Sequence, residues 1–119
     1  MLKSVLVLED NPLIAMDEEA MLKKFENPNV FIAFSVADAE NILVGNAVDF
    51  ALLDVELEGE TSEAIATRLH SSKVPFAFVS GYDDAGGLLG CFSGVPSLVK
   101  PLSENALRDT LRTYGLVRD

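Results

Sequence analysis

Polar residues follow four short apolar runs of this chain, each at the point where the run ends. They supply three carboxylates, a hydroxyl and an ammonium group: Glu9, Asp10, Asp54, Ser80 and Lys100. Because the strand ends of an open parallel α/β sheet share one edge, where ligands bind in a crevice, we expect these side chains to converge. Acids, a hydroxyl and a lysine at one edge are the composition of a Mg²⁺-assisted phosphoryl site.

The length and charge of the chain limit the functions that it can have. With 119 residues, of which 49% are hydrophobic, it is long enough for one continuous core, and we expect a single domain over residues 1–119. Its 19 acidic residues against 9 basic ones give a net charge of -10, which repels nucleic-acid phosphates. Direct binding to nucleic acid is therefore not expected.

The first residues and the cysteine content bear on location. Glu9 and Asp10 interrupt the first apolar run far below the length of a membrane span or a signal core. Cys91 is the sole cysteine, so no internal disulfide can form, which fits a reducing compartment. We expect a cytoplasmic protein that does not bind membranes.

Strand-like and helix-like segments alternate along the chain, which predicts βα units and a mainly parallel sheet covered by helices on both faces. The expected strands lie at residues 4–8, 30–34, 50–53, 76–79 and 97–99. The expected helices cover residues 12–25, 36–44 and 61–69, and a terminal helix follows its cap residue Ser103.

Local residue types support these helices. Pro12 suits a first helical turn, because its missing N–H would have no partner there. The apolar residues after it recur at the three- and four-residue spacing of one helix face: Leu13, Met16, Ala20, Met21, Leu22 and Phe25. Gly45 is expected to close the second helix in the left-handed conformation.

The stretch from Gly81 to Val95 is rich in glycine: Gly81, Gly86, Gly87, Gly90 and Gly94. Each interior glycine costs a helix about 1 kcal/mol relative to alanine. A helix in this stretch, the fourth along the chain, is therefore expected to be short, irregular or mobile.

The order of the chemistry-bearing residues resembles the receiver domain of two-component response regulators, along essentially the whole chain. The resemblance rests on the joint pattern of Glu9-Asp10, Asp54, Ser80 and Lys100-Pro101, each behind an apolar run. It implies a flavodoxin-like, doubly wound five-stranded parallel sheet with strand order 2-1-3-4-5. It also implies a signalling phosphoacceptor that assists its own phosphorylation and dephosphorylation, and not an enzyme in the usual sense.

The resemblance further implies a role for each site residue. Asp54 would accept a phosphoryl group from the phosphohistidine of a sensor histidine kinase or a histidine phosphotransfer protein. Mg²⁺ would be held by Asp10, Asp54 and the backbone carbonyl of Glu56, with Glu9 acting through water. Lys100, followed in the family by a cis bond to proline, would supply a cation for a phosphoryl oxygen.

Ser80 and Tyr82 are the expected switch residues. In the family, the hydroxyl at the position of Ser80 moves toward the phosphate and shifts the adjoining loop. The segment from Phe78 to Tyr82 is similar to the atypical FAT GUY subgroup, named for Phe-Ala-Thr-Gly followed by tyrosine, which lacks the usual aromatic residue at the position of Ser97. Tyr82 either replaces that missing ring or only packs over the loop.

Two other function classes remain open at this level. A pseudo-receiver would keep the fold as an unphosphorylated interaction module, but it would have no reason to preserve the acids and Lys100. A small phosphatase or mutase would use Asp54 as nucleophile with Glu56 as general acid, but 119 residues leave no room for a cap domain. No effector segment follows Asp119, so we expect output through a downstream protein partner, unless the chain is a piece of a longer protein.

Overall fold

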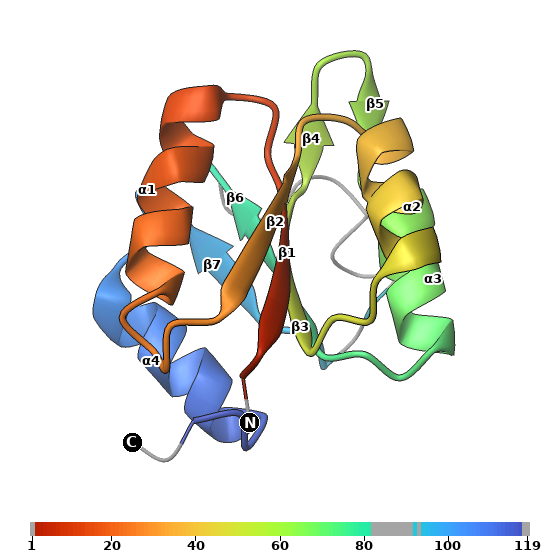
Figure 1. The fold of residues 1–119 in the computed structure, drawn as a ribbon. Helices are drawn as coiled ribbons and strands as arrows, with labels where there is room; N and C mark the ends of the chain where they lie inside the picture. The colour runs from red at the N-terminus through yellow and green to blue at the C-terminus, as the bar shows by residue number, and fades with distance from the viewer. Residues whose placement is uncertain (1, 82–91, 93, 118–119) are drawn as a thin grey trace.

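A five-stranded parallel sheet runs through the middle of the molecule, with helices on both faces (Figure 1). The computed structural model describes residues 2–81, 92 and 94–117. Helices α1 (Pro12–Leu22) and α4 (Glu104–Thr113) cover one face of the sheet, and α2 (Val36–Gly45) and α3 (Glu63–Ser71) cover the other.

The strands of this sheet are short and mostly buried. They are β1 (Ser4–Leu8), β2 (Asn29–Ala33), β3 (Phe50–Asp54), β6 (Phe76–Ser80) and β7 (Ser97–Val99). Their spatial order is β2-β1-β3-β6-β7, which is 2-1-3-4-5 when these five strands are counted along the chain. The doubly wound topology is therefore confirmed, because the strand order reverses between β1 and β3.

A second, two-stranded sheet lies in the connection between β3 and α3. Its strands β4 (Glu56–Leu57) and β5 (Glu60–Thr61) pair antiparallel around Gly59, which has a positive φ of 77°. This hairpin was not predicted from the sequence, and Thr61 was expected to begin the third helix. The helix begins at Glu63 instead, because Thr61 pairs with Glu56 across the hairpin.

Side-chain caps fix the beginnings of three helices. The Asn11 side chain accepts a hydrogen bond from the Leu13 N–H at 2.9 Å, and Ser35 accepts one from the Asp38 N–H at 3.1 Å. Ser103 caps α4 as predicted, accepting from the Ala106 N–H at 3.0 Å. Each such bond satisfies a helical N–H that has no partner within its helix.

Two helix ends differ from the sequence expectation. α1 ends at Leu22 and not at Phe25, and the connection to β2 then passes through Glu26 and Asn27 with positive φ values of 65° and 48°. Gly45 is the last residue of α2 and does not take the left-handed conformation; the helix is capped by Asn46, whose side-chain amide donates to the Ile42 carbonyl oxygen at 3.0 Å.

The predicted apolar face of α1 is confirmed only in part: Leu22 and Phe25 are buried and Met21 packs against the core, but its other members are exposed. Leu13 and Met16 are 74% and 59% exposed, and Ala20 is exposed as well. The buried residues of the helix are Ala15, Glu18 and Leu22. The stripe that meets the sheet therefore includes a carboxylate, and two large apolar side chains lie in solvent.

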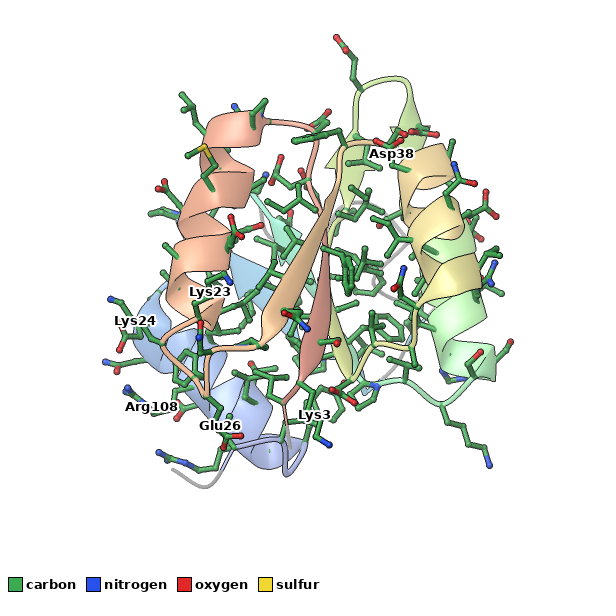
Figure 2. The ribbon with its side chains drawn as sticks, viewed as in Figure 1. Lys3, Lys23, Lys24, Glu26, Asp38 and Arg108 are labelled. Atoms are coloured by element: carbon green, nitrogen blue, oxygen red, sulfur yellow. The ribbon has the colours of Figure 1, made fainter. Side chains whose placement is uncertain are left out.

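A charged cluster joins the turn after α1 to α4 at one end of the molecule. The Glu104 carboxylate accepts hydrogen bonds from the Lys24 ammonium group at 3.0 Å and from the Arg108 guanidinium at 3.1 Å. The same guanidinium lies 5.4 Å from the centre of the Phe25 ring. Figure 2 shows Lys24 and Arg108 on the same side of the molecule, where these two helices meet.

The prediction for the fourth helix falls on residues outside the described part of the chain, as do Tyr82 and Cys91. None of the helices in the described part has the length and apolar character needed to cross a membrane.

The terminal segment offers a test of the fold. The Tyr114 hydroxyl donates a hydrogen bond to the Phe76 carbonyl oxygen at 2.8 Å, and its ring packs against Phe50. We expect Tyr114→Phe to lower the free energy of unfolding by about 0.5 to 1.5 kcal/mol, because the ring is kept and one hydrogen bond is lost. Urea denaturation measures this difference, and a variant as stable as the natural protein would contradict the contribution assigned to the bond.

Candidate functional site

The sheet brings together the residues that the sequence analysis selected. Glu9 and Asp10 follow β1, Asp54 ends β3, Ser80 ends β6 and Lys100 follows β7. All four strands are parallel, so these positions lie at the same edge of the sheet. The predicted convergence at the carboxyl ends of the strands is therefore confirmed.

Three carboxylates form the centre of the site. Glu9, Asp10 and Asp54 each offer an oxygen atom that lies within 4.8 Å of the other two. Glu9 and Asp54 are buried, with 1% and 6% of their surfaces exposed, and Asp10 is partly exposed. Such a set of oxygen atoms suits a hard divalent cation such as Mg²⁺, which keeps several waters and needs few protein ligands.

The Lys100 side chain neutralises part of this negative charge. Its ammonium nitrogen lies 3.0 Å from Glu9 Oε1 and 3.0 Å from Asp54 Oδ2. Its backbone is fixed as well, because the Lys100 N–H donates to the Ser80 carbonyl oxygen at 2.8 Å. The bond between Lys100 and Pro101 is cis, as the resemblance implied.

Burial and charge shift the protonation of this group of residues. Burial raises the pKa of the Glu9 carboxyl, although the ion pair with Lys100 and the hydrogen bond from the Asn11 N–H oppose that effect. Partial burial lowers the pKa of Lys100, but the hydrogen bond to Asp54 and the ion pair with Glu9 outweigh this effect, and the pKa is raised. The lysine therefore stays charged, and the site retains a fixed cation beside Asp54.

Glu9 also carries an incompletely satisfied oxygen. Within the described residues, its Oε1 atom is buried and has no hydrogen-bond partner of good geometry, although the Lys100 ammonium group is near. Its Oε2 atom accepts from the Asn11 N–H at 3.1 Å. A buried carboxylate oxygen with spare capacity can accept a bond from a metal-bound water, so the residues present fit a hydrated Mg²⁺ ion.

The β4–β5 hairpin reaches the site from outside the main sheet. Asp10 Oδ2 accepts a hydrogen bond from the Glu58 N–H at 2.7 Å, which orients the carboxylate. Glu60 at the far strand accepts a bond from the Val36 N–H at 3.1 Å and so connects the hairpin to the start of α2. Glu56 begins β4, two residues after Asp54, and its role as a backbone ligand stays a prediction.

Ser80 is 97% buried at the end of β6, on the strand next to Asp54. This position is compatible with a hydroxyl that meets a group bound on Asp54. Tyr82, the other expected switch residue, lies outside the described residues. The subgroup assignment and both switch roles stay predictions.

Glu18 is the site residue that sequence reasoning missed. It lies on the inward face of α1 and is 4% exposed. Burial, followed by the negative charges of Glu9 and Asp54, raises its pKa to about 8, against the opposing effect of Lys100. The spacing of Ala15, Glu18 and Leu22 contains the signal, because these residues recur with the period of one helix face.

Comparison with known proteins identifies signalling relatives. The chain is 32% identical over 117 residues to the sensory transduction protein LytT of Bacillus subtilis. The aligned region covers 95% of this chain and 48% of LytT. It is also 26% identical over 106 residues to the sensory transduction protein LytR of Streptococcus agalactiae. That alignment covers 84% of this chain and 43% of LytR. The chain thus spans about half the length of the curated relatives it matches. No family model matches it.

Solved structures agree with this result. SdrG from Sphingomonas melonis is 32% identical, with a TM-score of 0.78 and coverage of 93% of this chain and 94% of SdrG. A CheY-like receiver domain from Methylobacillus flagellatus is 21% identical and shares the fold, with a TM-score of 0.79 and coverage of 95% and 98%. The chain belongs to the response-regulator receiver domains, which are signalling modules of two-component systems and not classical enzymes.

The buried Glu18 carboxyl predicts a dependence of stability on pH. Folding raises its pKa from 4.5 to about 8, so the folded protein holds this proton more tightly than the unfolded chain. The resulting stability is fully present below about pH 4.5 and is lost as the pH rises toward about 8, by at most about 1.4 kcal/mol per pH unit. We expect Glu18→Leu to remove this loss and to be more stable than the natural protein near pH 8, with a smaller difference near pH 5.

Urea denaturation at the two pH values measures this effect. Glu19→Leu is the matched control, because Glu19 is the neighbouring glutamate on the same helix and is only partly buried. A stability difference between Glu18→Leu and the natural protein that does not change with pH would refute the assignment.

Proposed function

We propose that this chain is a phosphoacceptor receiver of a two-component phosphorelay, with Asp54 as the phosphorylated residue. The observation that carries the proposal is the contact of one ammonium group, that of Lys100, with both Asp54 and Glu9 at 3.0 Å, inside a cluster of three carboxylates. This arrangement places a cation and metal-ligating oxygens around a carboxylate that can act as a nucleophile.

In the proposed reaction, an Asp54 carboxylate oxygen bonds to phosphorus while the bond between phosphorus and the donor's histidine nitrogen breaks. The bonding electron pair stays on the imidazole, and the donor is a sensor histidine kinase or a histidine phosphotransfer protein. Two anions repel each other on approach, so the charge of Lys100 lowers the barrier by interacting with a phosphoryl oxygen. The Ser80 hydroxyl donates to another phosphoryl oxygen.

The proposal includes Mg²⁺ as the cofactor. Asp10 and Asp54 would bind it directly, with the backbone carbonyl of Glu56 and, through water, Glu9. When bound, the ion neutralises negative charge on the carboxylates and the phosphoryl oxygens. The Glu58 N–H holds the Asp10 carboxylate in place from the hairpin.

The output of the proposed receiver passes to a downstream protein partner. Phosphorylation would draw Ser80 toward the phosphoryl group and change the surface after β6, with Tyr82 as the expected second switch residue. We also propose that residues 1–119 form one domain that acts in the cytoplasm without direct contact to nucleic acid or membranes. The net charge of -10 supports the exclusion of nucleic acid.

Phosphorylation itself is tested by substitution of the acceptor. With Mg²⁺ and acetyl phosphate, or with a cognate kinase, we expect one hydroxylamine-sensitive phosphoryl group per chain by intact-mass measurement. Asp54→Asn should abolish it, because an amide is not a nucleophile under these conditions. Asp109→Asn is the control, since that exposed carboxylate lies on α4.

Equal labelling of Asp54→Asn would sink the assignment. A natural protein that is labelled by neither donor would favour the pseudo-receiver alternative, in which the fold serves as an unphosphorylated interaction module.

The metal is tested at Asp10. We expect Asp10→Asn to weaken Mg²⁺ binding at least tenfold, because a charged ligand is lost, while its amide oxygen can still accept the bond from the Glu58 N–H. Calorimetric titration measures the affinity, and circular dichroism checks that the fold is kept. Undiminished Mg²⁺ affinity in a folded variant would exclude Asp10 as a ligand.

A further inference from the structure

A cavity of about 520 Å³ opens between α1 and the segment that follows β7. Its walls combine apolar side chains with charged ones: Ile14, Ala20, Met21, Pro101 and Leu102 with Asp17, Glu18, Lys24 and Lys100. Its volume lies within the range of small-molecule sites, roughly 300 to 1,000 Å³. The cavity lies beside the carboxylate cluster, and Lys100, which contacts Asp54 and Glu9, forms part of its wall.

The Glu18 carboxyl is the unusual group in this wall. It is 96% buried, and within the described residues it makes no hydrogen bond or ion pair. Buried polar groups are almost always hydrogen-bonded, because desolvation without a partner costs free energy. A buried carboxyl that lines a cavity and has no protein partner is therefore positioned to accept a hydrogen bond from a molecule that enters the cavity.

The charges around the cavity favour a cationic donor. Both lysines in its wall are already compensated: Lys100 contacts Asp54 and Glu9, and Lys24 contacts Glu104. Asp17 adds a further carboxylate at the wall. Three carboxylates, those of Glu9, Asp54 and Asp17, act on Glu18 against one lysine, so the local field is negative.

We propose that this cavity binds an alkylammonium or alkylguanidinium group, with Glu18 as its counter-ion and the apolar wall holding its aliphatic stem. The cationic head would satisfy the buried carboxyl with a charge-assisted hydrogen bond, which is stronger than a neutral one. The stem would lie against Ile14, Met21 and Leu102. The group can belong to a free amine or to a lysine or arginine side chain of another protein.

The free-amine source is tested with n-pentylamine, and n-pentanol serves as the uncharged probe of the same shape. Both are titrated into the whole chain without Mg²⁺ or phosphodonor, so the result is independent of phosphorylation at Asp54. Backbone amide shifts in nitrogen-15 NMR spectra report binding, and we expect saturable changes centred on Ile14, Glu18 and Leu102 with the amine. We expect at least about tenfold weaker binding of the alcohol.

The side-chain source is tested with a short blocked peptide that contains one lysine between two leucines, against the same peptide with norleucine in place of lysine. Saturation by pentylamine shows that a free amine suffices. Saturation by the lysine peptide alone assigns the cavity to a basic side chain of a protein. Either result supports the proposal.

Glu18→Gln keeps the shape of the side chain but cannot ionise to a carboxylate counter-ion, and we expect it to weaken binding of the cationic probe at least about tenfold. Glu19→Gln, one residue further along α1, is the matched control and should bind as the natural protein does. The proposal fails if no cationic probe saturates the cavity, if the alcohol binds as well as the amine, or if Glu18→Gln binds unchanged. Because Glu18→Gln removes a destabilising buried acid, its fold should be kept, and its amide spectrum verifies this.

Discussion

The contact of the Lys100 ammonium group with two buried carboxylates is the interaction on which the site depends. Without a cation between them, Glu9 and Asp54 would be two acids of like charge in a region that excludes most water. Removing one partner of a buried ion pair leaves an uncompensated charge, which costs far more than the net gain of the pair. The lysine therefore makes it possible for the acids to lie close together, and that proximity gives the site its chemistry.

This contact requires three strands, β1, β3 and β7, to end at one edge of the sheet. β1 carries Glu9 to the edge, β3 carries Asp54, and β7 carries Lys100 from the far side of β6. The backbone bond from Lys100 to Ser80 fixes the last connection, and the bond from Glu58 to Asp10 closes the site from the hairpin. The parallel sheet therefore brings the acids and Lys100 close together, and the ion pairs stabilise this arrangement.

Glu18 extends the charged region beyond the carboxylate cluster. The proposed phosphoryl transfer assigns no role to the Glu18 carboxyl, and burial of an acid without a partner opposes folding. Glu18 lies in the wall of a cavity and close to the acids of the site. The proposed binding of a cation in this cavity would account for a buried acid that destabilises the free protein. The orientation of α1 that buries Glu18 also leaves Leu13 and Met16 exposed on the opposite side of the helix.

The strands, their parallel arrangement and the edge where the acids, Ser80 and Lys100 meet could be predicted from the sequence. Those features follow from local patterns, since a short apolar run that ends in a polar residue identifies both a buried strand and its functional end. The rotation of α1 and the β4–β5 hairpin could not be predicted from local patterns. Each depends on packing and hydrogen bonds between residues distant in the chain: the sheet selects which face of a helix is buried, and Glu60 reaches across to Val36. From the sequence, Glu18 would be expected on the surface, and its burial follows only from the packing of α1 against the sheet.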